Sequence, residues 1–139
     1  MQQDHLRNRE YVSQVINYAG LNFGKTIRPT DIDAMIEYHD KAFIFYELKY
    51  GDGEMPTGQR LALTRLVDNL DTIKPTLLVI CSHKTSYKKE IYLRDAIVTK
   101  YRRGGVWYTP QKPKTVYEIT ESFLNWIDGR SKNKWHMQK

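Results

Sequence analysis

The spacing of apolar residues divides the chain into helical and extended segments. Apolar side chains recur at helical spacing over residues 4–19, 59–70 and 115–128, which predicts an amphipathic helix in each range. Thr115 or Thr120 is the predicted N-cap of the last helix. The predicted buried face of the second helix consists of Leu61, Leu63, Leu66, Val67 and Leu70.

Extended segments separate the predicted helices. Residues 31–38 and 42–50 are rich in branched and aromatic side chains, and the turn His39–Lys41 between them predicts a hairpin. Residues 76–82 form a continuous apolar run of strand length, which is typical of a central strand buried on both faces.

The C-terminal third completes a single predicted domain. Strands are predicted at 95–101 and 106–110, on either side of the turn 102–105. The whole pattern predicts an α/β fold over residues 1–128, with a central mixed sheet flanked by helices. Residues 129–139 hold several basic residues and no acid after the aspartate at 128, and they are expected to form a flexible basic tail.

Composition and charge limit the class of protein and the kinds of partner it can bind. The 139 residues are 40% hydrophobic and 27% charged, as in a globular protein, and no apolar run approaches the roughly 18 residues of a membrane helix. The polar N-terminus and the single cysteine predict a cytoplasmic protein without a disulfide framework. The net charge of +6 favours a polyanionic partner such as nucleic acid.

The predicted hairpin brings acidic residues and a lysine together. Counting outward from a three-residue turn pairs Asp33 with Glu47 and Asp31 with Lys49, and paired residues share one face of the hairpin. Two carboxylates beside an ammonium group suggest a site for Mg²⁺, which prefers oxygen ligands. The alternative is that these are solvated charges at strand ends, with Asp31 paired to Lys49.

The same residues carry a resemblance to a known family. The stretch "TDID" at 30–33, followed by a hairpin into "ELK" at 47–49, resembles the core of the PD-(D/E)xK nuclease superfamily. The similarity extends over roughly residues 5–80, through a preceding helix, a following helix that starts at "GQRLAL", and the buried strand "TLLVICS". It implies a restriction-endonuclease-like core with elements in the order αβββαβ.

The first acid departs from the family pattern, in which proline directly precedes aspartate. Here a threonine separates Pro29 from Asp31, so either Asp31 or Asp33 is the candidate ligand, and Asp33 is preferred because it pairs with Glu47. The resemblance then implies metal ligands at Asp33, Glu47 and the backbone carbonyl of Leu48, with Glu10 at a second metal. The implied cofactor is Mg²⁺, for which Mn²⁺ can substitute.

The resemblance also implies an activity. Lys49 would position the attacking water and stabilise the transition state, and Gln59 would brace the site or contact the nucleic-acid backbone. The expected protein is a metal-dependent DNA endonuclease that recognises branches, flaps or ends rather than sequence, as in DNA recombination or repair. It would work in a prokaryotic or phage-infected cell, and a homodimer or a partner protein that supplies specificity fits the family. The alternatives are a non-catalytic nucleic-acid-binding protein on the same fold, an exonuclease or RNA-directed nuclease with the same site, and an interaction protein without nucleic acid.

Basic residues and tyrosines alternate over residues 84–103. This pattern predicts a surface that contacts phosphates, and its alternative is a solvated edge of two strands. The predicted contact residues are Lys84, Lys88, Lys89, Lys100, Arg102 and Arg103.

Other chemically distinctive residues are expected to be structural. Trp107 and Trp126 lie within apolar stretches and are therefore expected to be in the core, whereas Trp135 in the tail is expected to be exposed. Cys81 sits within the apolar run and predicts a buried thiol, and His83 predicts a hydrogen-bonded structural histidine.

Overall fold

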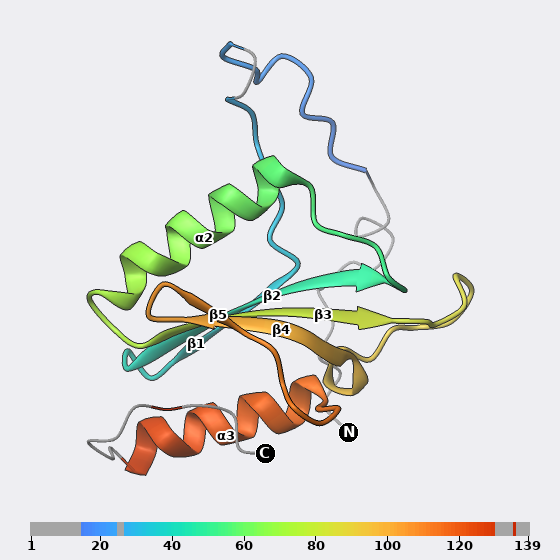
Figure 1. The fold of residues 1–139 in the computed structure, drawn as a ribbon. Coiled ribbons are helices and arrows are strands. Elements are labelled where there is room, and N and C mark those ends of the chain that lie inside the picture. Colours follow the sequence, from blue (N-terminus) through green and yellow to red (C-terminus); the bar gives the residue numbers. More distant parts are fainter. Residues whose placement is uncertain (1–14, 25–26, 130–134, 136–139) are drawn as a thin grey trace.

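Over the described residues the architecture is a five-stranded mixed sheet between the helices α2 and α3, and it confirms the predicted α/β class. The computed structural model describes residues 15–24, 27–129 and 135. Helix α2 covers one face of the sheet and α3 the other (Figure 1). In chain order the elements are β1 (Ala34–Tyr38), β2 (Ala42–Tyr50), α2 (Thr57–Asp71), β3 (Thr76–His83), the short 3₁₀ helix η1 (Leu93–Asp95), β4 (Ile97–Arg103), β5 (Val106–Tyr108) and α3 (Val116–Gly129).

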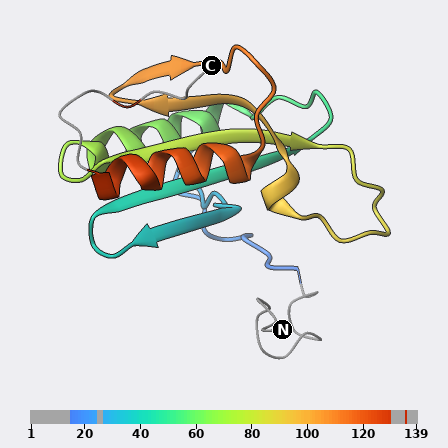
Figure 2. The same cartoon turned by 90° about the horizontal axis from the view of Figure 1, so that it is seen from below.

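Strand order follows the chain, as β1-β2-β3-β4-β5. Among the strands of the described chain, only the neighbours β2 and β3 run parallel. Helix α2 is the crossover between them, because parallel neighbours cannot be joined by a tight turn. Figure 2 shows α3 lying across the sheet, with β1 and β5 at opposite edges. The central strand β3 is buried from Thr76 to Cys81, as the apolar run predicted.

The hairpin turn has the predicted length. Tyr38 pairs with Ala42, so His39, Asp40 and Lys41 form the connection. His39 and Asp40 have φ angles of 49° and 60°, and positive φ at both central positions is what a type I′ turn requires. The Lys41 N–H donates to the Tyr38 carbonyl at 2.8 Å and closes the turn.

Side chains on each strand alternate between two cores. The core under α3 contains Ile44, Tyr46 and Phe123, and the core under α2 contains Phe45 and Leu63. Residues of β2 with odd numbers therefore face α2, and this face carries the candidate site.

The first predicted helix is wrong where it can be checked. Residues 1–14 lie outside the described residues, whereas residues 15–19 are described and are not helical. Val15 and Ile16 are largely exposed, so no core is available to stabilise an apolar helix face there. The order αβββαβ is also not observed, because two strands rather than three precede α2 in the described chain. Within residues 15–24 and 27–33, the preceding segment contributes an isolated bridge between Phe23 and Ile27 and no strand.

The apolar face of α2 is narrower than predicted. Only Leu63 and Val67 are buried, at the i, i+4 spacing that faces the sheet, and Leu70 is partly buried. Leu61 lies about 160° around the helix from Leu63 and is exposed, as is Leu66 on the flank.

The last helix begins where a capping box forms. The Thr115 hydroxyl accepts the Glu118 N–H at 3.1 Å, and the Glu118 carboxylate accepts the Thr115 N–H at 3.0 Å. Thr115 is therefore the N-cap, whereas Thr120 shares a hydrogen bond with the Tyr46 hydroxyl. Among the described residues, no helix has the length and apolar character needed to cross a membrane.

Trp135 corrects the prediction of a flexible, exposed tail at one position. Its side chain is 8% exposed, and the indole N–H donates to the Ser122 hydroxyl at 3.1 Å. The ring lies 5.1 Å from the Phe123 ring, so a residue beyond the domain boundary completes the core under α3. Residues 130–134 and 136–139 lie outside the described residues.

The remaining structural predictions hold. Trp107 and Trp126 are half-buried against the two cores, and Cys81 is fully buried, which raises the pKa of its thiol to about 12. The ring of His83 accepts the Thr85 N–H at 3.1 Å, as expected of a structural histidine.

Candidate functional site

Four predicted site residues gather on the α2 face of the sheet. Glu47 and Lys49 lie on β2, two residues apart and therefore on one face. Asp33 directly precedes β1, and the hairpin register continued by one pair sets it opposite Glu47. Gln59 lies in the first turn of α2, the helix that covers this face of the sheet (Figure 1).

Gln59 links the acid and the lysine. Its amide N–H donates to Glu47 Oε1 at 2.7 Å, and its amide oxygen accepts from Lys49 Nζ at 3.2 Å. Lys49 Nζ also lies 2.9 Å from Glu47 Oε1. Because the amide donates at one end and accepts at the other, its orientation is defined and all three side chains are held together.

Glu47 carries a buried oxygen that the protein does not satisfy. The residue is 1% exposed, and among the described residues its Oε2 has no hydrogen-bond partner. Burial raises the pKa of this carboxyl, and the charge of Asp33 raises it further, while the hydrogen bond from Lys49 acts in the opposite direction. An unpaired buried carboxylate oxygen costs at least about 1–3 kcal/mol, so it calls for a partner such as a bound cation.

Asp33 is held beside Leu48. The Leu48 N–H donates to Asp33 Oδ2 at 2.7 Å. The N–H and C=O of one residue point to the same side of a strand, so the Leu48 carbonyl also faces the side on which Asp33 lies. The structure therefore places Asp33 beside Leu48, and near enough to Glu47 for its charge to raise the pKa of that carboxyl.

Asp31 occupies a different position. Its carboxylate accepts the Tyr18 hydroxyl, and its backbone carbonyl lies 3.5 Å from the Gln59 amide nitrogen. Lys49 pairs with Glu47, and no ion pair between Asp31 and Lys49 is present. The predicted pairing of Asp31 with Lys49 is thus wrong, and the geometry favours Asp33 over Asp31 as the acid beside Glu47.

The donor set fits a hard divalent cation. Carboxylate and carbonyl oxygens are the ligands Mg²⁺ prefers, and one or two carboxylates are the usual protein contribution. In the part of the chain that the structure describes, no group of three or more acidic, histidine or cysteine side chains is placed to hold a metal. The fit therefore rests on Asp33, the unpartnered Glu47 oxygen and the Leu48 carbonyl. The predicted ligand Glu10 lies outside the described residues.

Three predicted nucleic-acid contacts lie on a projecting loop. Lys84, Lys88 and Lys89 belong to the connection between β3 and η1, which extends beyond the end of the sheet (Figure 1). The Lys89 N–H donates to the Ser86 carbonyl at 2.9 Å, so the tip is a tight turn. Tyr87 at this tip is 91% exposed, as an aromatic contact surface would be.

Two other predicted contacts are engaged inside the protein. Arg102 donates twice to the Asp68 carboxylate, at 2.8 and 2.7 Å, and Arg103 pairs with Asp71. Their side chains are only 15% and 17% exposed. Contact with nucleic acid stays a prediction for these arginines, and it would require ion pairs with α2 to open. Lys100 is different, because it projects toward a cavity.

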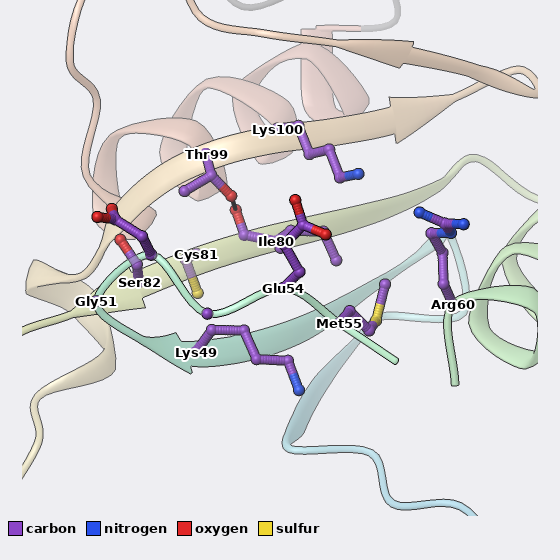
Figure 3. A pocket seen from close by; sticks show the side chains of 12 residues that line it. Lys49, Gly51, Glu54, Met55, Arg60, Ile80, Cys81, Ser82, Thr99 and Lys100 are labelled. Carbon is purple, nitrogen blue, oxygen red and sulfur yellow. Dashed lines mark hydrogen bonds between the residues drawn. The ribbon is translucent and has the colours of Figure 1, made fainter. Parts of the chain in front are cut away.

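This cavity was missed by the sequence argument. It has a volume of about 300 Å³ and adjoins Lys49, between the loop after β2, the first turn of α2, and strands β3 and β4 (Figure 3). Arg60 and Lys100 contribute positive charge to its wall. Arg60 directly follows Gln59 at the start of α2, and this adjacency was the available signal in the sequence.

Comparisons of the chain with models of protein families, with curated proteins and with solved structures find no match.

Proposed function

We propose that the chain is a metal-dependent nuclease that hydrolyses phosphodiester bonds in DNA, built on a restriction-endonuclease-like variant of the α/β fold. One observation carries the proposal. Glu47 is buried beside Asp33 and forms an ion pair with Lys49, and one of its oxygens has no hydrogen-bond partner among the residues that the structure describes. A purely structural acid would use both of its oxygens, whereas a metal ligand leaves one for the cation.

The residues have distinct tasks in this proposal. Asp33, Glu47 and the Leu48 carbonyl hold Mg²⁺, for which Mn²⁺ can substitute. The bound cation supplies Lewis acidity and lowers the pKa of a coordinated water. Gln59 holds Glu47 Oε1, so that the free Oε2 keeps its direction. Lys49 carries a positive charge at the same point and offsets negative charge that develops on the phosphate.

The choice of nucleic acid rests on charge. The net charge of +6 and the lysines of the projecting loop favour a polyphosphate backbone. The proposed substrates are DNA branches, flaps or ends, which the chain would recognise either as a homodimer or with a partner protein that supplies specificity.

Cleavage of a labelled DNA panel tests the proposal. The panel holds linear duplex, single strand, flap, four-way junction and covalently closed circle, each with Mg²⁺, with Mn²⁺ and with EDTA. We expect metal-dependent cutting that falls at least about a hundredfold in Asp33→Asn and in Lys49→Ala. Asp31→Asn is the matched control, because its carboxylate contacts Tyr18 rather than Glu47, and it should still cut.

The possible failures lead to different conclusions. Equal cutting by wild type and Asp33→Asn would show that the activity arises elsewhere. No cutting, with tight salt-sensitive binding that Asp33→Asn leaves unchanged, would favour the non-catalytic binding protein. Cutting of linear DNA but not of the closed circle would assign an exonuclease.

A further inference from the structure

The cavity beside Lys49 is lined by cations from three separate elements. Lys49 comes from β2, Arg60 from the first turn of α2 and Lys100 from β4. Figure 3 shows these side chains around a floor that includes Ile80. The volume of about 300 Å³ corresponds to roughly ten water molecules, which is room for a phosphate and its attached sugar.

The cations of α2 and β4 are paired at one end and unpaired at the other, where Asp52 and Glu54 also line the cavity. Away from the site, Arg102 and Arg103 are paired with Asp68 and Asp71 of α2. At the cavity, Arg60 and Lys100 have no carboxylate partner within ion-pair distance among the described residues.

The structure holds one of the two unpaired cations, Lys100, at the cavity. Lys100 Nζ lies 4.4 Å from the centre of the Trp107 ring, which positions the ammonium without neutralising it. The first turn of α2 has no acidic residue, so no side chain there competes for an anion.

We propose that this cavity is a phosphate-binding subsite next to the scissile phosphate, with Arg60 and Lys100 as the residues that bind the anion. The proposal rests on the proposed nuclease function, since it adds a second phosphate of the same substrate. Arg60 presents a planar fork of donors that matches phosphate oxygens, and Lys100 adds a point charge. Two sources of phosphate have this chemistry, an internal phosphodiester and a terminal phosphate monoester.

Glu54 provides a second test, in which substitution should strengthen rather than weaken the binding of phosphate. It lines the same cavity and its carboxylate lies among the cations in Figure 3, but it forms no ion pair with Arg60 or Lys100 among the described residues. A bound phosphate would be repelled by this carboxylate. Removing its charge should therefore strengthen binding, on the order of threefold.

The experiment measures binding of oligonucleotides in EDTA, so that no hydrolysis is needed for the result. Flap and single-strand substrates carry either a 5′-phosphate or a 5′-hydroxyl, and the dissociation constant is measured over a series of salt concentrations. The variants are Arg60→Gln, Lys100→Gln and Glu54→Gln. Arg65→Gln is the matched control, since Arg65 is an exposed arginine of the same helix that does not line the cavity.

The subsite predicts roughly tenfold weaker binding for Arg60→Gln and for Lys100→Gln, with a salt slope reduced by about 0.7–0.9 per lost contact. Arg65→Gln should bind as wild type does. If the variants lose affinity only for substrates with a 5′-phosphate, the subsite binds a terminal monoester. If they lose affinity equally for substrates with a 5′-phosphate and with a 5′-hydroxyl, it binds an internal phosphodiester.

Unchanged binding in Arg60→Gln and Lys100→Gln, or an equal loss in Arg65→Gln, would overturn the subsite while leaving the nuclease proposal to its own cleavage test. A wild-type protein that binds through Arg60 and Lys100 but never cuts would instead refute the nuclease and retain the phosphate site.

Discussion

Neutralising Glu47 should stabilise the metal-free protein. The pKa of this carboxyl is raised in the folded state above its ordinary value of 4.5, chiefly by burial. An acid with a raised pKa favours unfolding when it is ionised, so the folded protein carries a penalty at pH 7. The penalty is lost as the pH falls through the raised pKa toward 4.5. Glu47→Gln removes the penalty at every pH.

The magnitude follows from two opposing contributions. An unsatisfied buried carboxylate oxygen costs about 1–3 kcal/mol or more. The variant loses part of the interaction with Lys49, which lies 2.9 Å from Glu47 Oε1. The net gain is about 1–2 kcal/mol, and for a chain of this length it corresponds to a rise in Tm of roughly 3–8 °C.

Thermal unfolding with and without Mg²⁺ measures both the cost of the buried Glu47 oxygen and its binding of a cation. At a hundred times its dissociation constant, a cation that binds only the folded state adds about 2.7 kcal/mol, or roughly 10 °C in Tm. Wild type should show this shift and Glu47→Gln should not. The Tm advantage of the metal-free variant should also shrink between neutral pH and pH 4.5, because Glu47 becomes protonated in the wild type.

Glu121→Gln is the control, because Glu121 is an exposed acid of α3 on the opposite face of the sheet. Its free energy of unfolding should stay within about 0.5 kcal/mol of wild type at every pH, and Mg²⁺ should raise its Tm as much as it raises that of wild type. The reasoning is refuted if Glu47→Gln melts at or below the wild-type temperature and keeps the full Mg²⁺ shift. The buried oxygen would then be neither a cost nor a ligand.

Two further predictions concern the packing of Trp135 in the core under α3 and the ion pairs between α2 and β4. Trp135→Ala should lower the free energy of unfolding by about 3 kcal/mol, and Trp135→Phe by about 1 through the lost bond to Ser122. Chemical denaturation checks both, and wild-type stability in Trp135→Ala would contradict the packed position. Asp71→Asn should cost about 2–3 kcal/mol in the same assay, because the carboxylate pairs with Arg103 and is almost buried. Asp68→Asn, at a more exposed pair, should cost less than about 1 kcal/mol, and equal costs would refute the argument from burial.

The sequence predicts those parts of the fold in which local pattern and packing agree. The hairpin register could be counted from a short turn because strand side chains alternate strictly, and it placed Asp33 opposite Glu47 correctly. The buried strand β3 was equally visible, since an apolar run of that length has few alternatives.

Other features depend on contacts between distant parts of the chain, which no local pattern contains. Trp135 is buried by a ring of α3, and its basic neighbours in sequence indicate only a solvated tail. The sequence around Arg102 predicts an exposed cation, yet its guanidinium is paired with the carboxylate of Asp68, thirty-four positions earlier in the chain. The orphan oxygen of Glu47 likewise results from burial by α2, so the sequence suggested the ligand but not its unsatisfied state.

The His39–Lys41 turn lies at the far end of the hairpin from the acids, five ladder pairs away from Asp33. Its length nevertheless decides which side chain of β1 meets Glu47, because one residue more or less would reverse every side chain of that strand. Related chains should therefore be free to change the chemistry of this turn, within residues that accept positive φ, but not its residue count. The loop after β2 is under no such numerical constraint. In an alignment of relatives, gaps should occur after Tyr50 and be absent between Tyr38 and Ala42. The length of the turn would then be conserved because it sets the spacing of Asp33 and Glu47, although no residue of the turn takes part in the reaction.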